Sequence, residues 1–238
     1  ALIAHLTASG EVPPLTYGHA DVSEAVEFVD ALLDRLRAEG FDPLDLGTTT
    51  AVSIAPGDGA LRIDGEIAGV VDRGSSSVVV DVRASSLKAA HVIETMTDLV
   101  VATVARPDRE WSAVLHRCER QNRKLVLRRV ALSWADPSSA PGLLDLLVER
   151  RAEALTTPIP FFPEVAHELV AGHPDKAADA WEGSDYSQGA RDEAWHRLFF
   201  DHRFDEFGSH DLGRQIEGWW NPLCSAFEIE DDQKGAKW

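Results

Sequence analysis

The chain has 238 residues, of which 44% are hydrophobic, and its formal net charge is −17 at pH 7. This length and composition suit one large globular domain or two small ones and exclude wholesale disorder. The negative charge repels phosphate backbones and anionic membranes, so any contact with nucleic acid requires a local basic patch or a basic partner. Two distant cysteines, and no signal peptide or bilayer-length apolar run, predict a cytoplasmic chain without membrane contact or a disulfide framework.

Two helices are predicted at the start of the chain, over 1–9 and 21–40. Because the chain opens at Ala1 inside a helical pattern, we expect a compact unit excised from a longer protein. The second helix has apolar residues at steps of three and four, which predicts one buried face. This face consists of Val22, Val26, Val29, Leu33 and Leu36.

The pattern then changes to the two-residue period of strands. Three antiparallel strands are predicted over 48–55, 61–71 and 78–82, and the unbroken Val78-Val79-Val80 indicates a strand covered on both faces. A helix over 86–105 follows, with a core stripe of Ile93, Met96, Val100 and Val104. Two further strands are predicted over 111–118 and 124–132, and Pro141 suits the first turn of another helix.

This order of elements predicts an α/β fold with a core over 1–157. Residues 158–238 form an acidic, mostly helical appendage that we expect to pack on this core. The core order of helix, three-stranded meander, helix and two strands is that of the restriction-endonuclease-like, or PD-(D/E)XK, frame. That frame carries its chemistry on the meander, so the acidic meander is a candidate metal site.

The meander of a metal-dependent nuclease holds Mg²⁺ with carboxylates from its second and third strands. An acid-x-Lys triplet on the third strand places both side chains on one face. Here the triplet reads Asp81-Val82-Arg83, and arginine does not titrate near neutral pH. The acid of the second strand is expected in a Gly-x-Ile-Asp pattern, which here reads Gly65-Glu66-Ile67-Ala68. Ala68 has no side-chain oxygen to offer a metal, so we expect no catalytic residues and no bound metal.

Glu66 shares a strand face with Ala68 and is the acid that would compensate for it. An active Mg²⁺-dependent nuclease that uses Glu66, Asp81 and Arg83 is therefore the alternative function. The other interpretation of these acids is a solvated hairpin with weak ion pairs. No Gly-x-x-x-x-Gly-Lys-Ser/Thr pattern is present, so no nucleotide or other cofactor is expected.

One basic island interrupts the acidic chain, and it falls on the two strands after the second core helix. We expect it to contact DNA electrostatically or to bind an acidic partner, the alternative being a solvated hairpin. The candidate contact residues are Arg117, Arg120, Arg123, Lys124, Arg128 and Arg129.

Several segments in order along the chain resemble the C-terminal domain of the RecC family. These segments are "SGEVPPLTYG" before the first core helix, "GEIAGVV" and "VVVDVR" in the meander, "PIPFFPEVA" after the core, and "AWEGSDYSQGARDEAWHRLFF" and "WWNPLCSAF" near the end. RecC is the gamma subunit of exodeoxyribonuclease V, the RecBCD helicase-nuclease that unwinds and resects DNA ends in homologous recombination. The resemblance covers nearly the whole chain through the order of its motifs.

The resemblance implies a nuclease-like domain that has lost its active site, in agreement with Ala68 and Arg83. It also implies that the domain belongs to an ATP-dependent multi-subunit enzyme while being inactive itself. The implied partners are RecB-like and RecD-like subunits, with DNA in the context of the complex. A protein-binding domain unrelated to recombination is the third interpretation that the residues leave open.

Overall fold

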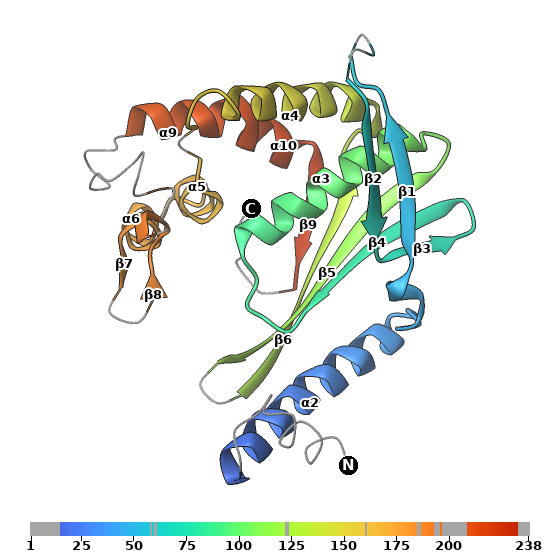
Figure 1. Cartoon of the computed structure of the whole chain (residues 1–238), viewed down its shortest axis with the longest axis vertical. Helices are drawn as coiled ribbons and strands as arrows, with labels where there is room; N and C mark the ends of the chain where they lie inside the picture. The colour runs from blue at the N-terminus through green and yellow to red at the C-terminus, as the bar shows by residue number, and fades with distance from the viewer. Residues whose placement is uncertain are drawn as a thin grey trace.

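The structure is a computed structural model that describes residues 15–57, 59, 61–121, 124–159, 161–184, 187–192, 196 and 209–232. The predicted helix over 1–9 lies outside these residues. At the centre is a five-stranded mixed sheet with the strand order β3-β4-β5-β6-β9 (Figure 1). Its strands are β3 (Val70–Arg73), β4 (Ser76–Arg83), β5 (Glu110–Gln121), β6 (Lys124–Trp134) and β9 (Phe227–Asp231). The predicted α/β class is therefore confirmed.

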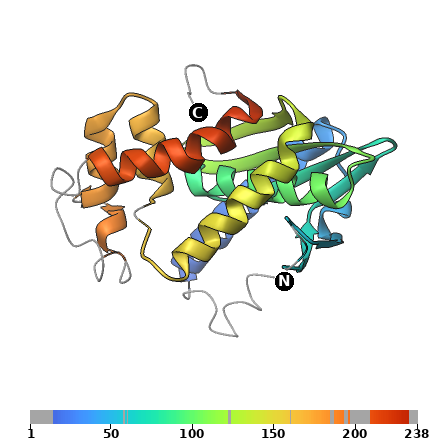
Figure 2. The same ribbon diagram turned by 90° about the horizontal axis from the view of Figure 1, so that it is seen from above.

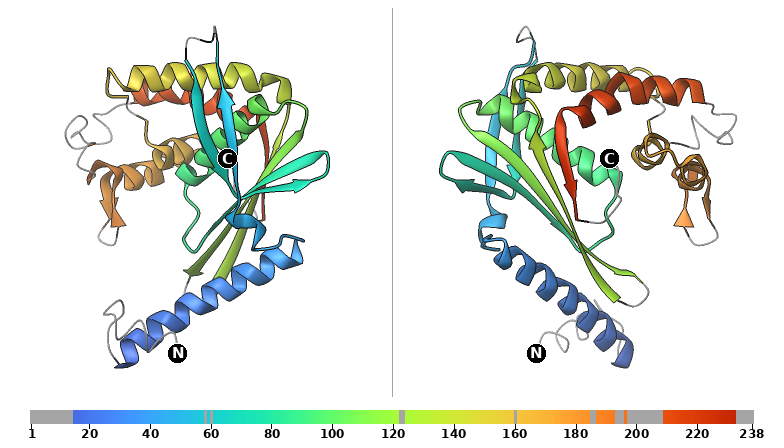
Figure 3. Two further views of the ribbon diagram at one scale, coloured as in Figure 1. Left: turned by 45° about the vertical axis from the view of Figure 1, so that its right-hand side comes forward. Right: turned by 180° about the vertical axis from the view of Figure 1, so that it is seen from behind.

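The predicted three-stranded meander is present, with its middle strand divided in two. β1 (Thr49–Ile54) pairs antiparallel with β2 (Ile63–Ala68), and β3 continues the chain into antiparallel pairing with β4. Gly69 alone separates β2 from β3, and its φ of +69° is a left-handed conformation that favours glycine. The bend at Gly69 leaves β1 and β2 as a separate two-stranded ribbon beside the main sheet (Figure 3).

The helix predicted over 86–105 is α3 (Ala89–Ala105), and it connects β4 to the parallel strand β5. Such a crossover helix is the usual way to join parallel neighbours. β5 and β6 then form an antiparallel hairpin, as predicted, with a register that runs from Ser112↔Ser133 to Gln121↔Lys124. α4 (Ala140–Ala154) begins one residue before Pro141 and packs against α3.

Both faces of the sheet bury apolar side chains. On the α3 face, Met96 and Leu99 pack in one cluster with Val79 and Leu115. On the opposite face, Val80 belongs to a smaller cluster that includes Leu36 of α2 (Leu15–Ala38). Val79 and Val80 are 2% and 5% exposed, which confirms that this strand is covered on both faces.

The predicted buried face of α2 is only partly correct. Val22 and Leu36 are buried as predicted, but Val26 and Val29 are 45% and 50% exposed. Helical spacing identifies an apolar face without showing how much of the helix the sheet reaches. α2 lies against β5 and β6 and, through Leu36, against the cluster that contains Val80 of β4 (Figure 1). Val26 and Val29 do not belong to this cluster and stay exposed.

The last third of the chain forms a mostly helical layer beside the sheet (Figure 2). Its helices are α5 (Pro163–Val170), α6 (Pro174–Glu182), α9 (Ser209–Gln215) and α10 (Asn221–Ser225). A π-helical turn, Ile216–Trp220, joins α9 to α10. Trp181 and Trp220 are buried in a second cluster, so both tryptophans serve packing. This segment also supplies β9, which pairs with β6 at the edge of the main sheet. None of the described helices is both long and apolar enough to cross a membrane.

Candidate functional site

The structure brings three of the predicted site positions together. Ala68, Asp81 and Arg83 line one cavity of about 330 Å³ at the junction of the β1–β2 ribbon and β4. Gly69 creates this junction, because its carbonyl accepts a hydrogen bond from the Val80 N–H at 2.9 Å. The end of β2 therefore lies beside the triplet on β4, as the sequence pattern predicts.

Glu66 does not line this cavity. It lies on the solvent face of β2 with Asp64, while the buried Ile67 points to the opposite side. The acid that would compensate for Ala68 is thus present on the correct strand face, but it is two residues too early to join the cavity. Its role in a metal site remains the weaker interpretation.

Asp81 is held by two arginines. Arg83 Nε donates to Asp81 Oδ1 at 3.2 Å, and an Arg117 terminal nitrogen donates to Asp81 Oδ2 at 2.6 Å. Arg117 also donates to the carbonyls of Asp81 and His116, at 3.2 and 2.9 Å. Both oxygens of the carboxylate that a metal would need are therefore occupied by guanidinium groups within the same chain.

Arg117 is the site residue that sequence reasoning assigned to the wrong environment. It is only 1% exposed. The parallel pairing of β4 with β5 places it directly opposite Arg83. Burial lowers the pKa of Arg117 and Asp81 opposes that shift, so the ion pair offsets the cost of burying the guanidinium. A signal exists in the sequence, since Arg117 follows Ala113 and Leu115 on the inward face of an alternating strand.

Two further acids on α3 complete the cavity. Glu94 accepts a hydrogen bond from Arg83 at 2.7 Å, and Asp98 lines the wall beyond it. Desolvation raises the pKa of Asp98 to about 6, and the neighbouring negative charges of Glu94 and Asp81 add to that shift. Among the described residues, no group of three or more His, Cys, Asp or Glu side chains is arranged to hold a metal ion.

Replacing Asp98 by asparagine is expected to stabilise the chain at neutral pH. The folded-state pKa of Asp98, about 6, lies above its ordinary value, so its stabilising contribution is complete at acid pH and lost as pH rises through 6. In urea unfolding at pH 7.5, the free energy of unfolding of D98N should exceed that of the unmodified chain by about 1 kcal/mol, which allows for solvent screening at a half-buried site. The gain should vanish near pH 4. The exposed acid Asp30, changed to asparagine, is the matched control, and an equal gain for D98N at both pH values contradicts this assignment.

The arginines of the predicted contact patch on β6 have partners inside the chain. Arg128 forms a two-pronged contact with Asp231 of β9, at 2.6 and 3.3 Å. Arg129 Nε donates to Glu39 Oε2 at 3.0 Å, and its backbone N–H donates to Asp232 at 2.9 Å. These residues join β6 to β9 and to the end of α2.

At the tip of the β5–β6 hairpin, contact with DNA or an acidic partner remains a prediction. Lys124 is exposed at the start of β6. The side chain of Arg120 and the whole of Arg123 lie outside the described residues. Arg117, by contrast, is buried beside Asp81 and has no surface to offer a DNA strand.

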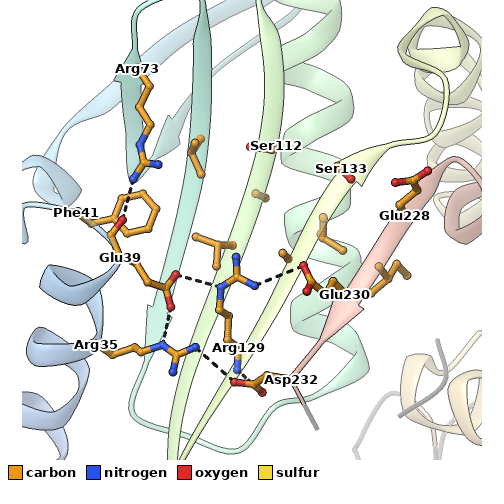
Figure 4. Close-up of a pocket in the computed structure, with 16 residues that line it drawn as sticks. Arg35, Glu39, Phe41, Arg73, Ser112, Arg129, Ser133, Glu228, Glu230 and Asp232 are labelled. Carbon is orange, nitrogen blue, oxygen red and sulfur yellow. Dashed lines mark hydrogen bonds and ion pairs between the residues drawn. The ribbon is translucent and has the colours of Figure 1, made fainter. Parts of the chain in front are cut away.

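A second cavity, of about 1000 Å³, lies on the α2 face of the sheet (Figure 4). Glu39 lines it and accepts hydrogen bonds from Arg35 at 2.5 Å and from Arg129 at 3.0 Å. Burial opposes ionisation of Glu39, but Arg35, His116 and Arg129 outweigh it, so the pKa of Glu39 is lowered. The third arginine of the lining, Arg73, stacks on Phe41 with 4.4 Å between the guanidinium carbon and the ring centroid. Every described arginine of this cavity is therefore engaged, which argues against a phosphate site.

The fold is that of a mixed α/β domain. In the cavity lined by Ala68, Asp81 and Arg83, the charged residues pair with one another. Comparison with known families gives a match to the RecC C-terminal domain over residues 1–173. The chain belongs to this family, and it is thus part of a RecC-like subunit of a RecBCD-type DNA-processing complex. A comparison with curated proteins found no match.

Proposed function

We propose that this chain is a non-catalytic scaffold domain of a cytoplasmic RecC-like subunit of exodeoxyribonuclease V. In this role it supports the unwinding and resection of DNA ends during double-strand-break repair by homologous recombination, and it binds the helicase partner subunit. The observation that carries the proposal is the state of Asp81, whose carboxylate is bound by Arg83 and Arg117. Ala68 lines the same cavity and has no side-chain carboxylate to offer a metal.

The order of elements supports a restriction-endonuclease-like frame for residues 1–157. A helix, an antiparallel meander, a second helix and a strand parallel to the third meander strand follow one another as α2, β1 to β4, α3 and β5. Residues 158–238 are then an appendage that contributes one edge strand to the sheet. The RecC family match supports the same assignment of the core.

The active nuclease is the weaker candidate for two reasons. Arg83 stays charged at every physiological pH, so it cannot act as the titrating base that a lysine provides. Arg83 is also engaged by Glu94 and Asp81, at 2.7 and 3.2 Å. Releasing it would expose two carboxylates, but Glu66 would still have to move into a cavity that it does not line.

The purified chain is expected to leave DNA intact. Single- and double-stranded DNA, linear and labelled at one end, should remain uncleaved in Mg²⁺ or Mn²⁺ beside an active metal-dependent nuclease as the positive control. Cleavage that disappears in both D81A and E66Q would overturn the non-catalytic assignment. E66Q is the sharper variant, because Glu66 is exposed and its replacement should leave the fold unchanged.

Co-purification of the subunits tests the scaffold role. The complete RecC-like subunit that carries this chain should co-purify with its RecB-like and RecD-like subunits, and deletion of this domain should release the RecD-like subunit. Retention of the RecD-like subunit after the deletion, with all subunits folded, contradicts the proposed helicase contact. The exposed tip residue Lys124 is the first position to mutate for an effect on DNA binding.

A further inference from the structure

β1 is an edge strand whose outer side is open within the described part of the chain. The Gly69 N–H donates to the Thr48 carbonyl at 3.1 Å, which fixes Thr48 and Gly69 as a hydrogen-bonded pair. Alternation along an antiparallel ladder then directs every second residue of β1 away from β2. The outward residues are Thr49, Ala51 and Ser53. No described residue bonds to their backbone N–H or carbonyl groups.

This edge lacks the features that normally protect an open strand. Natural edge strands avoid pairing with other chains through charges, proline, bulges or short length. β1 has six residues, reads Thr-Thr-Ala-Val-Ser-Ile, and pairs with β2 in unbroken register. A two-stranded ribbon is also only marginally stable alone, and a third strand would stabilise it.

The inner face of the ribbon is already closed, so only its edge and its outer face can receive a partner. Val52 and Ile54 of β1 and Ile67 of β2 are buried in the cluster that includes α3. The outer face of β1 consists of the small exposed side chains of Thr49, Ala51 and Ser53. An added strand can therefore approach β1 without a steric obstacle from its side chains.

The acidic side chains of β2 indicate that the added strand carries a basic residue. Ala51 is directly opposite Glu66, which is exposed and has no ion pair with any described residue. A lysine or arginine placed beside Ala51 on an added strand reaches across the small methyl group to Glu66. Asp64, opposite Ser53, adds negative charge to this face, although it pairs with Arg62 at 2.9 Å.

We propose that β1 accepts an extended segment of a partner subunit as a third, hydrogen-bonded strand, with a basic residue beside Ala51 that pairs with Glu66. The inference rests on the proposed scaffold function and names a surface for it. Backbone hydrogen bonds to Thr49, Ala51 and Ser53 supply the affinity, and the contact with Glu66 selects a basic segment.

Hydrogen exchange in the complete RecC-like subunit, alone and in the assembled complex, tests this surface directly. The amides of Thr49, Ala51 and Ser53 should exchange rapidly in the free subunit and at least about tenfold more slowly in the complex. Thr50, Val52 and Ile54 donate toward β2 and are the internal controls, with little change. Protection of the outward amides already in the free subunit overturns the proposal, because the subunit then covers its own edge.

A proline at position 51 tests the same hydrogen bonds by mutation. Ala51→Pro removes an N–H that points away from β2, a position where edge strands tolerate proline, so the ribbon should keep its fold. Losing this donor should weaken assembly by about tenfold or more, since a carbonyl of the added strand is left unpaired. Ala51→Thr keeps the N–H and is the matched control, with assembly within about threefold of the unmodified subunit.

Reversal of the charge at Glu66 tests the selection of a basic segment. Glu66→Lys should weaken assembly about fivefold, because it places like charges side by side. Normal assembly of a folded Ala51→Pro subunit overturns strand addition while leaving the scaffold function in place. Failure of the unmodified subunit to assemble with folded partners overturns both. If Ala51→Pro does not fold, hydrogen exchange of the outward amides in the unmodified subunit tests strand addition in its place.

Discussion

Replacing Arg117 by methionine is expected to lower the free energy of unfolding by about 3 kcal/mol. Arg117 is 1% exposed and gives Asp81 its shortest hydrogen bond, 2.6 Å, from the adjacent parallel strand. Methionine fills much of the same volume but leaves a half-buried carboxylate with Arg83 as its remaining cation. The loss is measured by urea unfolding at pH 7.5.

The size of this effect separates a structural ion pair from an ordinary surface contact. Arg62→Met is the matched control, because Arg62 and Asp64 are 70% and 60% exposed and such pairs contribute at most about 1 kcal/mol. In the double variant with Asp81→Asn, the cost of R117M should fall, since the uncompensated charge is absent. An R117M chain as stable as the R62M control contradicts the assignment of Arg117 as the counter-ion of Asp81.

Replacing Gly69 by alanine is expected to destabilise the chain by about 3 kcal/mol or more. Gly69 has a φ of +69°, and a Cβ at this position would lie 2.3 Å from the Val80 carbonyl oxygen. The left-handed conformation costs an alanine about 1 kcal/mol, and the clash with backbone adds to it because β4 is fixed on both sides by its neighbours. Thermal unfolding of G69A should therefore show a clearly lower midpoint.

Gly65 supplies the control for this substitution within the same strand. It has no positive φ, and a Cβ there meets nothing within 4 Å. G65A should be neutral or slightly stabilising, because alanine loses less backbone entropy on folding than glycine. Equal losses for G65A and G69A would show that the bend at Gly69 does not depend on the absence of a side chain.

The sequence predicted the local elements well because their signals are local. The strands of the meander, α3 and the β5–β6 hairpin follow from alternation, helical spacing and turn residues, and all are present. The juxtaposition of Ala68 with Asp81 and Arg83 was also predicted, because a meander fixes which strands are neighbours. These are short-range relations in the chain.

The features that were missed depend on contacts between distant segments. Arg117 reaches Asp81 because β5 lies parallel to β4, across 36 residues of sequence. The exposure of Val26 and Val29 depends on how far the sheet extends beneath α2, which helical spacing does not encode. The role of β9 as an edge strand depends on its pairing with β6, from which the whole helical layer separates it in the sequence.

The pairing of β9 with β6 has a consequence for how the chain folds during synthesis. The contact of Arg128 with Asp231 closes a loop of 103 residues, so β6 cannot receive its neighbour until the intervening layer has been made. At translation rates of roughly 5–20 residues per second, the nascent sheet has an open β6 edge for about 5–20 s. An open strand edge invites pairing with other chains, so the domain is at risk of aggregation during this interval.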